Sequence, residues 1–197
     1  MKPALFFLSL ALWSVSLTAC GPSPEPAQES PDSGASSSQP SPSAGETTES
    51  AVSVIVYLGT DGQFAEYPVE YTGDRTQTGQ VPATEVLAAM EKLTGWDLAL
   101  SHEIDSGRGG ITVTFADTCT LLSDLPEGMT AEDALERDRV VLDSVKRTLQ
   151  CWAIDPELGD PDAVDIWFCG PGGGDLTLSG TGVTISSTEP YEGLPSS

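Results

Sequence analysis

Residues 21–50 form the segment that most restricts what this chain can fold into. They contain no aromatic residue and no Val, Ile, Leu or Met, and they consist mainly of Pro, Ser, Gly, Glu and Thr. A segment with so little apolar surface cannot offset the entropy that is lost when its backbone is ordered. The sequence therefore predicts a disordered Pro- and Ser-rich linker over residues 20–50, and a hydrophobic core built only from the residues after it.

The residues before this linker resemble a bacterial lipoprotein signal peptide. Lys2 precedes an apolar stretch over residues 4–17, which is shorter than the roughly 20 residues that a membrane-spanning helix needs. Residues 17–20, LTAC, resemble the lipobox, in which small residues precede a cysteine whose sulfur carries a diacylglyceryl group. We expect a signal peptide over residues 1–19 and lipid attachment at Cys20.

Two other interpretations compete with this one, a permanent transmembrane helix and an ordinary cleavage site that happens to contain a cysteine. A single acyl chain binds a membrane only weakly, whereas two chains anchor a protein stably. We therefore expect the protein to be held by lipid at the outer face of the bacterial cytoplasmic membrane, with the linker keeping the folded part away from the surface.

The charge of the chain limits the partners that it can bind. The formal net charge is −22, with 30 Asp and Glu against 8 Lys and Arg. Such a surface repels nucleic-acid phosphates and anionic lipid head groups. We expect no nucleic-acid partner, and membrane attachment through the lipid anchor alone. Acidic surfaces also keep secreted proteins soluble, so the charge by itself identifies no partner.

Residues 51–197 have the length of one domain, and their apolar pattern begins as a β-hairpin. Two strand-like stretches, residues 52–58 and 64–71, flank the turn sequence Gly-Thr-Asp-Gly. Pro68 lies in the second stretch and lacks an amide hydrogen, so we expect that strand at the edge of its sheet.

Two helices are predicted from apolar residues at helical spacing. The first contains Val86, Leu87, Met90 and Leu93 and ends at Gly95. The second begins at the N-cap residue Thr130. Its apolar stripe consists of Val141, Leu142, Val145, Leu149 and Trp152, and Arg139, Asp143 and Lys146 lie outside that stripe.

The remaining elements are strands. Residues 96–104 and 111–116 are strand-like and are joined by the glycine-rich sequence DSGRGG, residues 163–168 alternate as another strand, and residues 176–186 indicate a last small hairpin. The order β-β-α-β-β-α-β predicts an α+β fold over residues 51–187, a single two-layer domain with two helices on one face of a mixed sheet. We expect residues 188–197 to form a flexible tail.

Four stretches carry a resemblance to a known domain: SVIVYLGTDGQ, VPATEVLAAMEKL, GITVTFA and VLDSVKRTLQCWAIDPELGDPDAVDIWFCG. Together they resemble the GerMN domain, the sporulation and spore-germination module, over roughly residues 52–172. Two features differ from the family pattern. The stretch TCTLLSDLPEGMTAED resembles an insertion, and Cys169-Gly170 stands where the family more often has an acidic residue and glycine.

This resemblance implies a non-catalytic extracytoplasmic domain, related to the ring-building modules of secretion and sporulation complexes. Such a domain acts through contacts with another protein of the envelope, and the resemblance supplies no catalytic residue and no cofactor. A solute-binding lipoprotein and an envelope hydrolase are the alternative functions.

His102, the single histidine, is the natural starting point for a catalytic site. Its neighbours Ser101 and Glu103 cannot form a triad with it, because adjacent residues of a strand point to opposite faces. We expect His102 to be a surface residue. One histidine and scattered cysteines also give no zinc-ligand spacing.

An acidic loop after the second predicted helix is the best metal candidate. Asp155, Glu157, Asp160 and Asp162 offer the oxygen ligands that calcium prefers, although the loop lacks the spacing and the terminal glutamate of an EF-hand. The competing interpretation is a solvated run of charges between two elements.

Three cysteines remain once Cys20 carries lipid, which is an odd number for an oxidising compartment. A right-handed strand–helix–strand crossover would place Cys119 and Cys169 beyond the same ends of neighbouring strands, and Cys151 at the far end of the helix. We predict a Cys119–Cys169 disulfide with Cys151 as a packed thiol. Three free thiols are the alternative.

Overall fold

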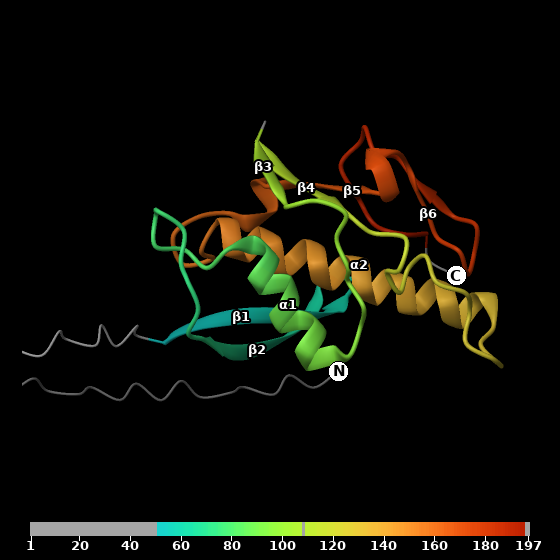
Figure 1. The fold of residues 1–197 in the computed structure, drawn as a ribbon, viewed down its shortest axis with the longest axis horizontal. Helices are drawn as coiled ribbons and strands as arrows, with labels where there is room; N and C mark the ends of the chain where they lie inside the picture. The colour runs from blue at the N-terminus through green and yellow to red at the C-terminus, as the bar shows by residue number, and fades with distance from the viewer. Residues whose placement is uncertain (1–50, 108, 196–197) are drawn as a thin grey trace, which may run out of the picture. The chain divides into compact units, whose positions relative to one another are not determined.

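The computed structural model describes residues 51–107 and 109–195 (Figure 1). The predicted signal peptide, the lipid attachment site Cys20 and the whole predicted linker lie outside the described residues. Within the described part of the chain, no helix is both long and apolar enough to cross a membrane.

The structure is a mixed α+β fold with two helices, as predicted. Its strands are β1 (Val52–Thr60), β2 (Gln63–Tyr71), β3 (Asp105–Gly107), β4 (Gly110–Thr114), β5 (Asp165–Cys169), β6 (Leu176–Thr177) and β7 (Thr184–Ile185). The helices are α1 (Ala83–Thr94) and α2 (Ala131–Ala153), with short 3-10 turns η1 (Pro161–Ala163) and η2 (Pro171–Gly173).

The first two strands form the predicted hairpin. Asp61 and Gly62 make its two-residue loop with φ values of 52° and 74°, the left-handed conformation that a type I′ turn requires. Ile55 of β1 lies opposite Pro68 of β2. Because β2 pairs with no strand but β1 among the described residues, Pro68 occupies an edge strand, which confirms that prediction.

Both helices begin and end where their sequences indicate. Gly95 ends α1 in the left-handed conformation, with its amide bonded to the Glu91 carbonyl. At the start of α2 the Thr130 side chain accepts from the Asp133 amide, and the Asp133 carboxylate accepts from the Thr130 amide. This reciprocal capping box satisfies two amides of the first turn.

The second sheet contains β3, β4 and β5. Strand β4 pairs in parallel with β5, and α2 forms the crossover between them, as predicted. The strand predicted over residues 96–104 is absent except for a bridge between Leu100 and Phe115, and β3 lies further along, at Asp105–Gly107. Side chains bind much of the 96–104 backbone instead, since the Leu98 amide donates to the Glu91 carboxylate at 2.8 Å.

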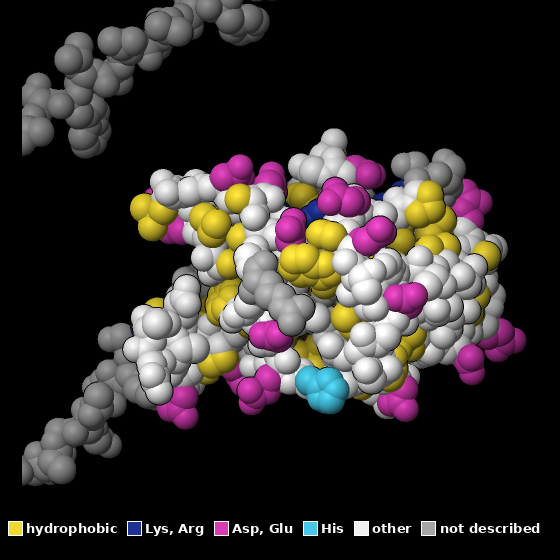
Figure 2. Space-filling model, turned by 90° about the horizontal axis from the view of Figure 1, so that it is seen from above, with side chains coloured by type: hydrophobic (Ala, Val, Ile, Leu, Met, Phe, Trp, Pro, Cys, Tyr) yellow, Lys and Arg dark blue, Asp and Glu magenta, His cyan; other side chains and the backbone are white. Residues whose placement is uncertain are grey.

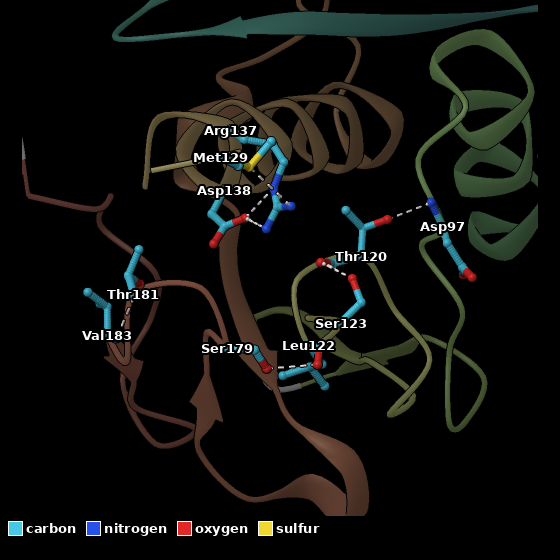
Figure 3. A network of polar contacts seen from close by, with 10 residues as sticks. All are labelled: Asp97, Thr120, Leu122, Ser123, Met129, Arg137, Asp138, Ser179, Thr181 and Val183. Atoms are coloured by element: carbon cyan, nitrogen blue, oxygen red, sulfur yellow. Dashed lines mark hydrogen bonds and ion pairs between the residues drawn. The ribbon is translucent and has the colours of Figure 1, made fainter. Parts of the chain in front are cut away.

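In the part of the chain that the structure describes, the strands lie in three separate small sheets, so the prediction of one mixed sheet is wrong. Helix α2 lies between the β1–β2 hairpin and strand β5, as the views in Figures 1 and 3 agree. The physical reason is hydrogen bonding along the edge of β1 that faces away from β2. Hydroxyl groups of α2 occupy part of the backbone edge of β1 that a neighbouring strand would need.

The core surrounds α2 on several sides. Its predicted stripe residues Val141, Leu142, Val145 and Leu149 are fully buried. Arg139 lies outside that stripe, yet it is only 6% exposed. Its guanidinium donates to the Glu136 carboxylate and to the Pro195 carbonyl, so burial of its charge is compensated by polar contacts.

The prediction of a flexible tail is wrong for residues 188–195. Tyr191 is 2% exposed and Leu194 is 9% exposed. The Tyr191 ring lies edge-on to the Phe168 ring, with the two centroids 5.0 Å apart. The backbone amide of Tyr191 donates to the Ile166 carbonyl at 2.7 Å. The tail therefore adds an aromatic ring to the core. The sequence did not predict this packing, because the tail has a single tyrosine among polar residues.

Candidate functional site: a groove at the open edge of β1

Strand β1 has one edge paired with β2 and one edge that faces away from it. In an antiparallel hairpin, alternate residues direct both their amide and their carbonyl to the partner strand, and the residues between them direct these groups outward. With Thr60 opposite Gln63 at the loop, the outward residues of β1 are Ser53, Ile55, Tyr57 and Gly59.

Helix α2 covers half of this outer edge with two hydroxyl groups. Thr148 Oγ1 accepts from the Tyr57 amide at 2.9 Å and donates to the Tyr57 carbonyl at 3.3 Å. One turn earlier, Ser144 Oγ accepts from the Gly59 amide at 3.0 Å and donates to the Gly59 carbonyl at 3.2 Å. Both side chains are fully buried, so they take the place of a neighbouring strand.

One helical turn after Thr148, α2 no longer covers the edge of β1. Trp152 follows Thr148 at helical spacing, but its indole N–H donates to the Val81 carbonyl at 2.8 Å and not to β1. Among residues 51–107 and 109–195, the outward amides and carbonyls of Ser53 and Ile55 have no hydrogen-bond partner. The first half of β1 therefore presents an open backbone edge.

A groove of about 740 Å3 runs beside this open edge, within the size range of ligand-binding clefts. Apolar side chains on its walls include Ile55, Trp152 and Leu158, and Leu158 is 86% exposed. Glu66, Asp155 and Glu157 contribute carboxylates, and none of the described residues that line the groove is Lys or Arg. We call this site the edge groove.

The floor of the edge groove contains a tyrosine and a cysteine. Burial raises the pKa of Tyr57 to about 12, and the adjacent Cys151 thiol adds to that effect. Burial also raises the pKa of Cys151, so the thiol is protonated at neutral pH. Arg147 lies over the Tyr57 ring and is paired with Asp162 at 3.0 Å. These groups make packing and ion-pair contacts in the floor of the groove, and the protonated Cys151 thiol is not activated as a nucleophile.

The predicted calcium ligands do not converge on one point. The Asp155 carboxylate accepts from the Glu157 amide at 2.9 Å, and the Asp160 carboxylate accepts from the Asp162 amide at 3.1 Å. Within the described part of the chain, no group of three or more His, Cys, Asp or Glu is placed to hold a metal ion. Asp155 and Glu157 instead line the edge groove.

His102 is exposed, as predicted, and Figure 2 shows this single histidine at the surface. Its neighbour Ser101 donates its hydroxyl to the Phe115 carbonyl at 2.9 Å. This serine therefore holds the segment before β3 against the residue that follows β4.

Cys119, Cys151 and Cys169 are free thiols, and the predicted Cys119–Cys169 bridge is not formed. The residue that follows β4, Phe115, lies between the segments that carry the two cysteines. On one side its amide donates to the Cys169 carbonyl, and on the other it bridges to Leu100. Cys119 belongs with the second side, because the amide of the next residue, Thr120, donates to the Asp97 carbonyl.

One buried carboxylate was not anticipated from the sequence. Asp138 has a fully buried side chain, and its Oδ1 accepts from Arg137 Nε at 2.9 Å and Nη2 at 2.7 Å (Figure 3). Its Oδ2 has no hydrogen-bond partner in the described structure. Burial raises the pKa of this carboxyl, and the Arg137 charge only partly opposes that change.

Comparison with protein-family models, with curated protein sequences and with solved structures gives no match to this chain. The candidate site therefore rests on the geometry of the described residues alone.

Proposed function

We propose that the chain is a lipid-anchored interaction and assembly module at the outer face of the bacterial cytoplasmic membrane. It acts by binding another envelope protein and not by catalysis. The LTAC sequence at residues 17–20 and the apolar-free segment after it support the anchor and the linker. Its partner is reached at the distance from the membrane that the linker allows.

The likeness to the GerMN domain enters this proposal as a GerMN-like role, in sporulation, germination or another envelope assembly. The four sequence stretches that carry the likeness support it, together with the β-β-α-β-β-α-β order of the elements. We also propose that these elements form an arrangement like that of the ring-building modules. In this arrangement α2 lies between the β1–β2 hairpin and the parallel strands β4 and β5.

The observation that carries the proposal is the edge groove. Its open backbone edge at Ser53 and Ile55 and the exposed side chain of Leu158 are features that a protein partner covers. Exposed strand edges tend to pair with other chains unless they are protected. A soluble domain that leaves one open beside an apolar wall has the chemistry of a binding surface.

Photo-crosslinking of the full chain in cells tests this function. A photoreactive residue replaces Leu158 in the groove, and the control replaces Leu93, which is also exposed but lies outside the groove. We expect a crosslinked protein partner from position 158 and not from position 93. Equal crosslinking from both positions, or none from position 158, would contradict the proposal.

A solute-binding lipoprotein is the second candidate function, because the groove volume and its carboxylates also suit a small cationic solute. Native mass spectrometry of the full protein purified from cells distinguishes the two. A bound molecule of small mass, lost from a Glu157→Gln variant, would favour solute binding.

A further inference from the structure

The hairpin protects its two outer edges very differently. On β2 the outward backbone position at the centre of the strand is Pro68, which has no amide to offer another chain. On β1 the outward groups of Tyr57 and Gly59 are bonded to α2. The outward groups of Phe64, Glu66 and Glu70 on β2 are also unpaired among the described residues, but Pro68 interrupts that edge. The open edge at Ser53 and Ile55 is continuous and lies beside the edge groove, which indicates a docking position.

Two outward residues supply two amides and two carbonyls at the spacing of a strand. A strand-like segment of about five residues from another chain, roughly 17 Å long, could pair with residues 52–56 of β1. Such strand addition gives affinity through main-chain hydrogen bonds, and pockets beside the strand select the side chains. Trp152 and Leu158 provide the apolar wall on which alternate side chains of the added strand would pack.

The charge of the groove selects among the chains that could occupy it. Glu66, Asp155 and Glu157 line it without a Lys or Arg among the described lining residues. Carboxylates near an interface attract basic side chains and repel acidic ones. The added strand should therefore carry Lys or Arg in alternation with apolar residues.

Two occupants are disfavoured by the same charge argument. The chain's own residues 21–50 contain five acidic side chains, Glu25, Glu29, Asp32, Glu46 and Glu49, and no Lys or Arg. A second copy would bring a further net charge of −22 and would face carboxylates with carboxylates. Like charges across an interface suppress such pairings.

We propose that the open edge of β1 binds an extended, basic segment of another protein by strand addition, with Ser53 and Ile55 as the pairing residues. This inference rests on the proposed function, because it names the chemistry of the partner that the interaction module recognises. Its elements are the unpartnered backbone of β1, the apolar wall of the groove and the carboxylates that line it.

Fluorescence anisotropy with labelled octapeptides and the full-length protein tests the pairing. The probe is an N-acetylated peptide of alternating Lys and Val. We expect saturable binding that weakens as salt rises, because the charges in an open groove are screened. A peptide of alternating Glu and Val should not bind, and the Lys–Val peptide with every backbone nitrogen methylated should bind at least about tenfold more weakly, since each lost hydrogen bond weakens binding roughly fivefold to tenfold.

A pair of proline variants supplies the matched control on the protein. Ser53 and Glu70 lie directly opposite each other in the hairpin, and each directs its amide outward from its own strand. Ser53→Pro removes a donor from the open edge of β1, whereas Glu70→Pro removes one from the outer edge of β2. We expect Ser53→Pro to weaken peptide binding at least about fivefold and Glu70→Pro to leave it within twofold of the parent.

The charge contribution is tested in the same assay. Glu157→Gln in the groove should weaken binding of the Lys–Val peptide and reduce its salt dependence. Glu127→Gln changes the same charge at an exposed site outside the groove and should have no effect. Equal effects of the two variants would show attraction to the overall negative charge, and would overturn the groove as the site.

Equal binding of the methylated and unmethylated peptides, or of the Lys–Val and Glu–Val peptides, would also overturn the inference. The peptide comparison uses the parent protein, so it decides the matter even if Ser53→Pro fails to fold. If position 158 crosslinks a protein while no Lys–Val peptide binds, strand addition is wrong and the interaction module stands. If position 158 crosslinks nothing, the proposed function itself fails.

Discussion

The hydroxyl groups of Ser144 and Thr148 should contribute a large share of the stability of the hairpin. Replacing them by Ala and Val removes two buried acceptors and leaves the outward amides of Gly59 and Tyr57 without partners. Each buried amide that loses its hydrogen bond costs about 1–3 kcal/mol. The Ser144→Ala/Thr148→Val variant should therefore lose about 2–6 kcal/mol of a total stability that is typically about 5–15 kcal/mol.

Urea unfolding of the two proteins measures this loss. With a denaturant slope of about 2 kcal/mol per molar urea, the midpoint should fall by roughly 1–3 M. Thr177→Val is the control, because it removes an exposed hydroxyl that contacts Thr184 and should change stability by less than about 0.5 kcal/mol. A midpoint of the double variant within about 0.2 M of the parent would refute the view that α2 holds the edge of β1.

Three further predictions follow from buried groups elsewhere. Tyr191→Ala should lower the free energy of unfolding by about 3–5 kcal/mol in chemical denaturation, since the ring packs on Phe168. A loss under about 1 kcal/mol would support a flexible tail instead. Burial raises the pKa of Asp138 in the folded state, so the folded protein retains a proton that the unfolded chain releases. The stability contributed by this proton is fully present below about pH 4 and is lost as pH rises. Asp138→Asn should therefore show a smaller fall in stability between pH 4 and pH 7, and an unchanged pH slope would count against this burial effect. Non-reducing peptide mapping should find Cys119, Cys151 and Cys169 as thiols, with Cys119 alkylated most slowly because burial raises its pKa to about 11; a linked pair would contradict the structure.

Local signals in the sequence predicted the elements whose causes are local. The Asp61-Gly62 loop, the glycine that ends α1 and the capping box at Thr130 each depend on residues a few positions apart. The crossover from β4 through α2 to β5 also followed, because parallel neighbours joined by a helix obey a strong rule of handedness and connection.

The predictions that failed depend on contacts between distant parts of the chain. Residues 96–104 read as a strand, but the Glu91 side chain and Thr120 bind backbone amides of that segment. The single mixed sheet failed because Ser144 and Thr148 reach the backbone of β1 across 85 and 91 positions of sequence. Their spacing within an apolar stripe was the available signal, since two hydroxyls on a buried helix face need partners.

The edge groove itself was only partly foreseeable. Asp155 and Glu157 were singled out as oxygen donors, and the structure places both beside β1 as separate lining residues. The open edge at Ser53 and Ile55 depends on where the stripe of α2 turns from Thr148 to Trp152, and on the bond of that tryptophan to Val81. No pattern in the sequence of β1 alone distinguishes its covered half from its open half.

Amide hydrogen exchange of β1, measured by NMR with and without the Lys–Val octapeptide, tests the central claim most directly. In the unbound protein, the amides of Tyr57 and Gly59 should exchange slowly because Thr148 and Ser144 bind them, and those of Ser53 and Ile55 should exchange fast. The peptide should slow Ser53 and Ile55 and leave Tyr57 and Gly59 unchanged. Slow exchange at Ser53 and Ile55 without peptide, or no change when the peptide is bound, would contradict an open edge that accepts another strand.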